Sequence, residues 1–359
     1  MSTPDMPGEV DWKSHLSSEK LPNLAALLTV KGGEIMAMSK IPVTVISGFL
    51  GTGKTTLVNH LLSHNKQYRI GVVVNEFGEV GIDGQLIVSE QEALIEINNG
   101  CVCCTVRADL VTSIKEMLAL AGQRLDRLII ETSGLADPAP VLQTFLADPD
   151  LRTQVELESV ITVVDALHLN IQLADEIVRE QIAFADTLIL NKTDLISSDA
   201  LASIHDQIRL VNRTANVIQA THSQVSIDAL LGTRRFSLPN LLMIEPDILG
   251  DEDHDHEHDA SISSCSVVTS GALDADRFNR WINQLVQNQG QQLMRMKGLL
   301  NFASEARRFH FHSVHMLLEA IPGRRWEADE TRDNRFVFIG RDLDSNNLRQ
   351  GFLDCLSAV

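Results

Sequence analysis

A glycine-rich stretch that ends in a lysine and two threonines, GFLGTGKTT at residues 48–56, has the composition of a phosphate-binding loop. Two glycines flank four residues, and Lys-Thr follows, as in the loops that hold nucleotide phosphates with main-chain N–H groups. In such loops the lysine reaches the β- and γ-phosphates and the next hydroxyl ligates Mg²⁺. A turn that merely opens a helix is the alternative. We predict a nucleotide site that uses Gly48, Gly51, Thr52, Gly53, Lys54, Thr55 and Thr56.

The sequence Asn191-Lys192-Thr193-Asp194, which follows the apolar run TLIL, predicts which base is bound. A carboxylate at Asp194 can accept hydrogen bonds from both N1–H and the exocyclic amine of guanine, whereas adenine offers no such pair. This short string also occurs in ordinary turns, but its place after a phosphate loop and two further strands favours guanine. We therefore predict GTP and GDP as ligands, with Asn191, Lys192 and Asp194 near the base.

An acidic residue ends the apolar run RLIIE, and Thr-Ser-Gly follows it. We expect this residue, Glu131, to hold Mg²⁺ through water, because Mg²⁺ usually keeps several of its waters. A carboxylate that caps the next helix is the alternative. Gly134 is expected where the γ-phosphate approaches, and Lys54 and Glu131 are the candidate catalytic residues. The acidic, glycine-containing turns between residues 75 and 84 predict a mobile segment that senses the nucleotide.

Three of the five cysteines, Cys101, Cys103 and Cys104, lie within four residues. Such spacing is too crowded for ordinary disulfides, and thiolates suit Zn²⁺ or Cu⁺. An extended chain points Cys104 away from the other two, so a turn is needed for all three to converge. Tetrahedral Zn²⁺ requires a fourth ligand, which Glu79, Glu76, a partner protein or water could supply. Buried or redox-sensing cysteines are the alternative.

Histidines form two further groups of candidate metal ligands. The stretch DEDHDHEHD at residues 251–259 consists only of Asp, Glu and His, which predicts either a weak auxiliary site for Zn²⁺, Ni²⁺ or Co²⁺ or a solvating acidic linker. Its candidate ligands are His254, His256 and His258. Further along, His310 and His312 are expected to share one face of a strand, with His315 on the other face, and such strand histidines are more often structural than metal-binding.

Six β-branched runs between residues 41 and 221 must position the nucleotide motifs. They alternate with stretches of helical period, which is typical of a mostly parallel sheet with helices on both faces. We predict an α/β P-loop NTPase domain over residues 40–232. The six runs are IPVTVIS, RIGVVVN, RLIIE, SVITVVD, TLILNK and ANVIQA.

A second, smaller α+β domain is predicted for residues 263–359, after a linker over 233–262 that contains the acidic histidine stretch. Its elements are expected in the order β-α-β-β-β-α, with helices near 275–287 and 346–356 and with RRFHFHSVHMLLEA as one strand. Residues 1–39 have weak periodicity and are predicted to be a flexible extension.

The composition argues against several classes of protein. The chain has 30 Lys and Arg against 48 Asp and Glu, a formal charge of −18, which disfavours binding to nucleic acid or to anionic membranes. The run from Ile41 to Gly53 has 13 uncharged residues, short of the roughly 20 that span a membrane. The start of the chain lacks the basic and apolar regions of a secretory signal, so a cytoplasmic protein is expected.

The motifs GFLGTGKTT, NEFGEVGID, GCVCC, ETSGLADP and NKTD occur in this order, and MKGLLNF and RFVFIG follow. Over about residues 41–340 the sequence therefore resembles the CobW-like GTPases, a metallochaperone branch of the P-loop GTPases that is related to the nickel-insertion GTPases of urease and hydrogenase. The resemblance implies GTP hydrolysis coupled to metal delivery, and a C-terminal domain of the CobW type. Relatives often carry Glu where this chain has Val74, which removes one accessory metal ligand.

We expect a GTPase that binds zinc at the cysteine motif, with cobalt or nickel as alternatives, and delivers the metal to a client metalloprotein. Its partners are GTP, a divalent metal ion and this client. A passive metal store, in which the nucleotide only stabilises the fold, is one alternative. Others are a P-loop kinase and a cobalt-insertion factor for cobalamin synthesis or nitrile hydratase activation.

Overall fold

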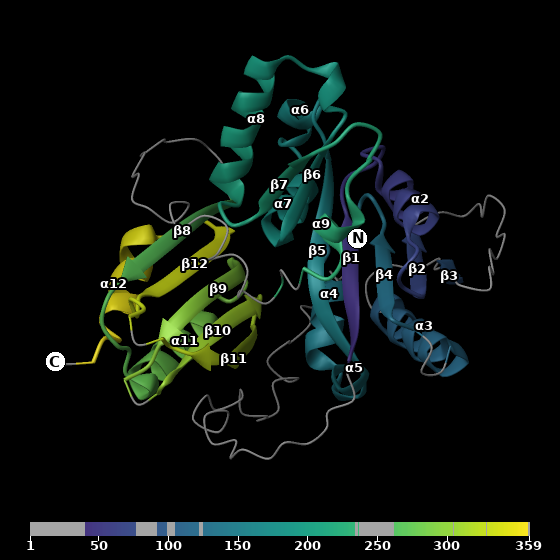
Figure 1. Ribbon diagram of the computed structural model, residues 1–359. Coiled ribbons are helices and arrows are strands. Elements are labelled where there is room, and N and C mark those ends of the chain that lie inside the picture. Colours follow the sequence, from purple (N-terminus) through teal and green to yellow (C-terminus); the bar gives the residue numbers. More distant parts are fainter. Residues whose placement is uncertain are drawn as a thin grey trace, which may run out of the picture.

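The structure of the chain is a computed structural model, and its ribbon has two parts side by side (Figure 1). It describes residues 40–76, 92–98, 105–121, 125–233, 236, 262–303, 305–327 and 329–357. The predicted extension, residues 1–39, and most of the predicted linker lie outside the described residues.

The first part is a seven-stranded parallel sheet in the order β3-β2-β4-β1-β5-β6-β7. All six predicted runs are strands, so the predicted parallel α/β fold is confirmed. The seventh strand, β3, lies at the edge and was not predicted, because the glutamates in EALIEIN interrupt its apolar pattern. The strands are β1 (Ile41–Ser47), β2 (Ile70–Glu76), β3 (Glu92–Asn98), β4 (Arg127–Thr132), β5 (Val155–Asp165), β6 (Thr187–Asn191) and β7 (Asn216–Gln219).

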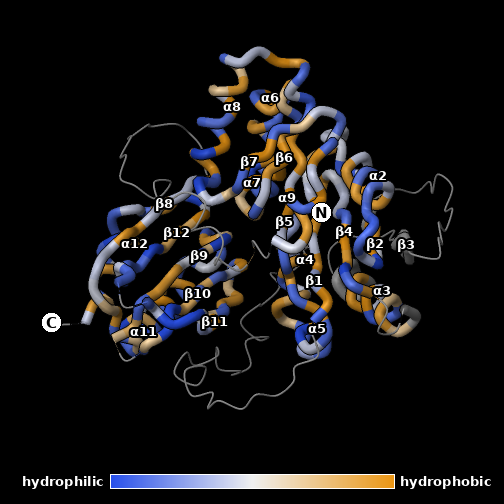
Figure 2. The backbone as a smooth tube through the Cα atoms, viewed as in Figure 1, coloured by the Kyte–Doolittle hydropathy of each residue, from blue (hydrophilic) through white to orange (hydrophobic). Residues whose placement is uncertain are grey.

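Helices cover both faces of this sheet. Residues of α3, α4, α7 and α8 share one hydrophobic cluster with one face, while residues of α2 and α9 pack in another cluster against the opposite face. The buried strands β5 and β6 are strongly hydrophobic, while α8 alternates between hydrophobic and hydrophilic turns (Figure 2). The helices are α2 (Lys54–His64), α3 (Thr105–Ala121), α4 (Ala139–Ala147), α5 (Pro149–Gln154), α6 (Leu169–Gln172), α7 (Glu176–Phe184), α8 (Ser198–Val211) and α9 (Ile227–Leu230), with a 3-10 turn at Thr193–Leu195.

The second part is a five-stranded antiparallel sheet in the order β11-β10-β9-β12-β8. The predicted small α+β domain is confirmed in class, and its elements follow the predicted order except that the sheet has one strand more than predicted. RRFHFHSVHMLLEA forms two strands joined by a tight turn at His315, whose φ of 50° is left-handed. The elements are β8 (Ile262–Thr269), α11 (Ala275–Gln289), β9 (Leu293–Asn301), β10 (Arg307–Val314), β11 (Leu317–Arg325), β12 (Asn334–Arg341) and α12 (Ser345–Leu353).

The turn at His315 corrects the histidine prediction as well. His310 and His312 do lie on one strand, β10, but His315 follows its end and does not occupy the opposite face. The turn was missed because its sequence contains no Gly, Pro, Asn or Asp, the residues that usually indicate a tight turn. It brings the His315 ring within 5.6 Å of the Phe184 ring, at the boundary between the two sheets.

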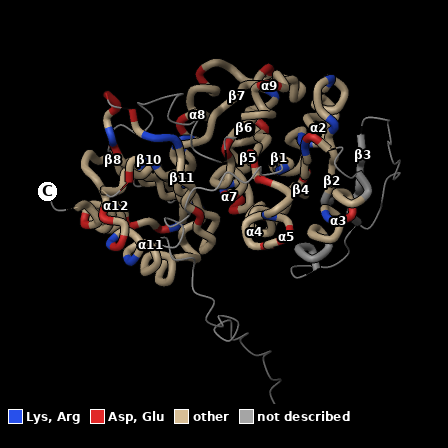
Figure 3. The backbone as a smooth tube through the Cα atoms, turned by 60° about the horizontal axis from the view of Figure 1, so that its bottom comes forward, with Lys and Arg blue, Asp and Glu red and all other residues tan. Residues whose placement is uncertain are grey.

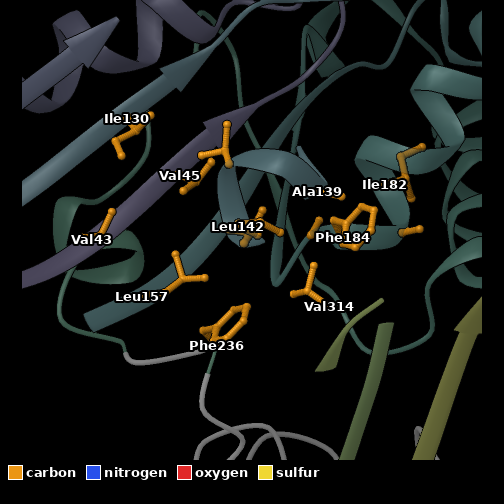
Figure 4. Close-up of a cluster of buried hydrophobic side chains, with 14 of the residues drawn as sticks. Val43, Val45, Ile130, Ala139, Leu142, Leu157, Ile182, Phe184, Phe236 and Val314 are labelled. Atoms are coloured by element: carbon orange, nitrogen blue, oxygen red, sulfur yellow. The ribbon is translucent and has the colours of Figure 1, made fainter. Parts of the chain in front are cut away.

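The two parts share buried surface. One face of the antiparallel sheet packs on α11 and α12 around Phe278. Apolar residues of its other face, such as Val314 and Val337, belong to the same cluster as α7 and the parallel sheet. Figure 4 shows Val314 beside Phe184, with Phe236 below Leu157. One hydrophobic cluster therefore extends across both sheets.

Charged groups also cross this boundary. Asp186, directly before β6, is fully buried and receives Arg295 at 2.5 Å and Lys297, both from β9. Arg341 at the end of β12 pairs with Glu180 and, at 2.7 Å, with Glu176 of α7. Acidic segments occur in both parts of the molecule (Figure 3), and the formal charge of the whole chain is −18. Among the described helices, none has the length and apolar character of a membrane span.

Stability is expected to fall in mild acid because of His310. Its side chain is buried on β10, and burial, together with the nearby charges of Arg308 and His312, lowers its pKa from 6.5 to about 4. The unfolded chain takes up a proton near pH 6.5, so it binds more protons than the folded state between these values, and acid favours unfolding. We expect His310 to account for a loss of roughly 2 kcal/mol between pH 7 and pH 5.

Urea unfolding of the wild type and of His310→Leu at both pH values measures this contribution. The variant lacks the titrating group, so its loss of stability between pH 7 and pH 5 should be smaller by that amount. An identical loss in the two proteins would contradict the prediction.

Candidate nucleotide-binding site

The glycine-rich loop joins β1 to α2 at the carboxyl edge of the parallel sheet, where α/β sheets bind their ligands. Gly48, Gly51 and Gly53 all have positive φ. Gly53 has φ 108°, and a Cβ there would lie 2.6 Å from Asn191 Nδ2 and 2.7 Å from Ser223 Oγ. A side chain at this position is therefore excluded both by conformation and by space.

Side chains of the loop hold its shape and face a cavity of about 300 Å³. The Thr52 hydroxyl donates to Phe49 O at 2.9 Å, and Lys54 Nζ donates to the same carbonyl at 3.1 Å. The cavity is lined by residues of the loop and of the end of β4. Of the predicted phosphate-site residues it contains Gly51, Gly53, Lys54, Thr55, Thr56, Glu131 and Gly134.

Thr55 and Glu131 meet in this cavity. The Thr55 hydroxyl donates to Glu131 Oε1 at 2.7 Å, although the residues are 76 positions apart in the chain. A hydroxyl and a carboxylate oxygen at the phosphate loop fit the oxygen ligands that Mg²⁺ prefers. The alternative, in which Glu131 caps the next helix, is wrong: Pro138 is the N-cap of α4, and the Asp137 carboxylate receives the Ala139 N–H at 2.8 Å.

Gly134 lies against the phosphate loop. A Cβ at this position would be 2.9 Å from Leu50 N and 3.0 Å from Leu50 Cα, so only glycine allows the two segments to approach this closely. Leu50 itself and the neighbouring Leu135 are each 53% exposed. The loop after β4 is thus placed beside the cavity, as the γ-phosphate role of Gly134 requires.

The Asn-Lys-Thr-Asp motif is tied to the phosphate loop by hydrogen bonds. Asn191 Nδ2 donates to Thr52 O at 2.9 Å, and Lys192 Nζ donates to Gly51 O at 2.9 Å. Asp194 lies in the 3-10 turn after β6 and is exposed. The structure therefore brings the predicted base-binding and phosphate-binding motifs together, with Asp194 open to a ligand.

Two residues of this network were not predicted from the sequence. Ser223 Oγ donates to Gly53 O at 3.0 Å, and its main-chain N–H donates to Asn191 Oδ1 at 2.8 Å. Asp165, at the end of β5, accepts from Lys192 Nζ at 2.6 Å. Burial by itself raises the pKa of Asp165, but its bonds to Lys192 and His168 outweigh this effect and lower the pKa below its usual value.

Most of the predicted ligands of the cargo metal fall on residues that the structure does not describe. Glu79, Cys101, Cys103, Cys104, His254, His256 and His258 lie outside the described residues, and only the main chain of Glu76 is described. Within the described ranges, no group of three or more His, Cys, Asp or Glu side chains could hold a metal ion.

The histidines and cysteines in the second part of the structure make contacts that stabilise the fold. His312 contacts Glu319 at 2.9 Å, and Glu319 also receives Arg152 at 3.3 Å. Cys265 and Cys355 are buried free thiols. Burial raises the pKa of Cys355 to about 12, so this thiol is protonated at neutral pH.

Comparisons with known proteins agree with this division into two sheets. A model of the CobW/HypB/UreG nucleotide-binding domain matches residues 42–219, and one of the cobalamin synthesis protein CobW C-terminal domain matches residues 262–356. The zinc chaperone YjiA of Escherichia coli is 34% identical over 322 residues, which cover 88% of this chain and 98% of YjiA. The zinc chaperone CobW of a Sinorhizobium species is 32% identical over 347 residues, which cover 86% and 96%. The crystal structure of Zn(II)-bound YjiA GTPase from E. coli superposes with a TM-score of 0.71 at 31% identity, over 89% of this chain and 100% of that one.

Proposed function

The chain belongs to the CobW/HypB/UreG family of P-loop GTPases, and from this membership we propose that it is a metallochaperone that binds zinc at its cysteine motif and delivers the ion to a client metalloprotein. The observation that carries the GTPase part of the proposal is the contact between Thr55 and Glu131 in the phosphate cavity, since a GTPase needs both a hydroxyl and a carboxylate there. The similarity to zinc chaperones supports the metal part. Zinc is favoured over cobalt and nickel because the relatives that share most of the chain's length are named zinc chaperones.

The phosphate loop supplies binding and charge compensation for GTP. Main-chain N–H groups of the loop surround the phosphates, and the Lys54 ammonium, now bonded to Phe49 O, moves to the β- and γ-phosphates. Thr55 and Glu131 would hold Mg²⁺, the latter through water. When bound, this ion neutralises charge that develops on the phosphate oxygens. Gly134 positions the loop after β4 at the γ-phosphate.

The guanine base is read at the other end of the same edge. The exposed Asp194 carboxylate accepts from N1–H and the exocyclic amine, while Asn191 and Lys192 fix the phosphate loop to the base site. Because these two residues bond to main-chain carbonyls of Thr52 and Gly51, the base and phosphate subsites are rigidly connected. Occupation of one subsite therefore preorganises the other.

The metal is the cargo, and its site is Cys101, Cys103 and Cys104 with Glu79 or Glu76 as a further ligand. This motif lies in the chain between β2 and β4, whose ends approach the phosphate cavity through Val74 and Glu131. If GTP favours the arrangement that binds zinc, then zinc must favour GTP by the same factor. Hydrolysis then loosens the site and releases the ion to the client. His254, His256 and His258 act as a weaker auxiliary site that raises the local concentration of metal.

Titration with Co²⁺, a spectroscopic substitute for zinc, tests this coupling. Thiolate charge-transfer absorption is expected, and it should differ between the complex with GDP and the complex with a non-hydrolysable GTP analogue. Replacing Cys101, Cys103 and Cys104 by serine should remove the absorption and the effect of zinc on the GTP hydrolysis rate. Cys265→Ser is the matched control, because this buried thiol should leave both unchanged.

The same titration separates the proposal from passive metal storage. A store would bind Co²⁺ equally in both nucleotide complexes, and free zinc would not change the rate of GTP hydrolysis. A variant with His254, His256 and His258 replaced by alanine should lose only the weaker equivalents of metal, since a chain that must order itself around an ion binds it less tightly. Loss of the tight equivalent instead would assign the primary site to the histidines.

A further inference from the structure

One buried side chain of α7 holds the loop that contacts the phosphate cavity. Gln181 is 1% exposed, and its Nε2 donates to Gly134 O at 3.2 Å and to Ala136 O at 3.1 Å. Its own main-chain carbonyl accepts from Thr162 Oγ1 of β5 at 2.8 Å. The side chain is therefore anchored to the sheet at its base and to the loop at its tip.

The orientation of this amide is fixed by its partners. Two main-chain carbonyls require the NH₂ group, because the amide oxygen in the same place would face two other acceptors. The Oε1 atom is buried and has no hydrogen-bond partner among the described residues. A buried acceptor without a hydrogen bond costs free energy, and the two bonds that the NH₂ group donates to the loop offset this cost.

The clamped segment has little freedom to move without changing the cavity. Gly134 is in close contact with Leu50 of the phosphate loop, and Gly134 itself lines the cavity. A displacement of the Gly134 and Ala136 carbonyls therefore shifts the wall that faces the γ-phosphate. Lys54, on another wall of this cavity, and the base-binding residues outside it belong to other segments and would stay in place.

The helix that carries Gln181 is also held by the antiparallel sheet. Glu180, the preceding residue, pairs with Arg341 at the end of β12, and Glu176 pairs with the same guanidinium at 2.7 Å. Asp137, at the end of the clamped loop, interacts electrostatically with Arg341 and with His315. The loop and its clamp thus have a direct connection to the C-terminal part of the chain.

We propose that Gln181 is a positioning residue for GTP hydrolysis: its amide holds the Gly134–Ala136 carbonyls so that the loop meets the γ-phosphate, and Arg341 fixes the helix that carries it. This inference rests on the proposed role of Gly134 at the γ-phosphate. It assigns to α7 a function that neither nucleotide motif contains, namely selective recognition of the triphosphate over the diphosphate.

Gln181→Glu tests the role of the clamp, since it keeps the shape but replaces the donor by an acceptor. Affinity for a non-hydrolysable GTP analogue and kcat for GTP hydrolysis are each expected to fall roughly tenfold, as for the loss of one to two hydrogen bonds, while GDP affinity changes less than about twofold. Gln181→Met, which keeps the length without hydrogen bonds, should show the same pattern and serves if the glutamate variant does not fold.

Asn212→Asp is the matched control. Asn212 is a buried amide whose Nδ2 donates to three carbonyls at the C-terminal end of α7, directly after Gln181: those of Ile182, Ala183 and Ala185. It should lower the melting temperature as Gln181→Glu does, but leave the ratio of GTP-analogue to GDP affinity unchanged. Arg341→Ala should lower kcat roughly threefold with GDP affinity retained.

Two results would overturn the inference: equal losses of GDP and GTP-analogue affinity in Gln181→Glu, or unchanged values for both with a normal kcat. The proposed function fails separately, if the wild type itself does not hydrolyse GTP. In that case the ratio of GTP-analogue to GDP affinity still decides whether Gln181 positions the loop.

Discussion

Replacing Asp194 by asparagine is expected to weaken GTP binding by roughly 10²- to 10⁴-fold. The carboxylate accepts two hydrogen bonds from guanine, and bonds to a charged group contribute about 1.5–3 kcal/mol each. Xanthine carries an oxygen in place of the exocyclic amine, so an asparagine amide can donate to it. The variant should therefore bind xanthosine triphosphate better than GTP. Competition titrations with a fluorescent nucleotide measure both affinities.

The control for this substitution is Asp199→Asn. Asp199 is an exposed carboxylate in the first turn of α8, five residues further along the chain. It should leave the affinities for GTP and for xanthosine triphosphate unchanged. Wild-type protein should bind GTP and GDP far better than ATP, and equal affinity for ATP and GTP would contradict the assignment of guanine.

Local motifs made much of the site predictable. Thr55 and Glu131 were both assigned to Mg²⁺ from their own sequence contexts, and the structure brings their oxygens to 2.7 Å. Thr55 lies in the first turn of a helix that follows a glycine-rich loop, and Glu131 lies near the end of a buried strand. Both elements have a clear sequence pattern. The parallel order of the strands then places these ends at one edge.

The residues that were missed act on the main chain of distant segments. Ser223 bonds to the carbonyl of Gly53, 170 positions away, and Gln181 bonds to Gly134, 47 positions away. A serine or glutamine that donates to a carbonyl has no required neighbour in the sequence, so no local pattern indicates it. The turn between β10 and β11 was not predicted for a related reason. It contains no turn-forming residue, and tertiary contacts of His315 stabilise it instead.

Buried charges also connect the two sheets over a long separation in the sequence. Asp186 and Arg295 are 109 positions apart, yet both are at most 1% exposed. Burial by itself raises the pKa of Asp186, but Arg295 and Lys297 outweigh it and hold the pKa below its usual value. The carboxylate is therefore ionised at neutral pH and neutralises part of the positive charge of β9.

Asp186→Asn is expected to destabilise the protein by about 3–5 kcal/mol. Removing one partner of a buried ion pair leaves charge that the interior cannot solvate, and this cost exceeds what the pair itself contributes. Asp186 Oδ2 also accepts the Val160 N–H at 2.8 Å, and the amide can retain that bond. The loss therefore reports the charge interaction with β9. Urea unfolding at pH 7 measures it.

The matched control is Asp126→Asn, which breaks a pair of the opposite kind. Asp126 contacts Arg69 at 3.0 Å, but both side chains are more than a third exposed, and such surface pairs contribute about 0–1 kcal/mol. A loss below about 1 kcal/mol for Asp186→Asn would mean that water or other groups solvate Arg295 and Lys297.

The same unfolding curves test whether Asp186 couples the two sheets. Because one apolar cluster extends across both sheets, the wild type should unfold in a single transition. Two separate transitions in Asp186→Asn would show that this carboxylate couples the sheets.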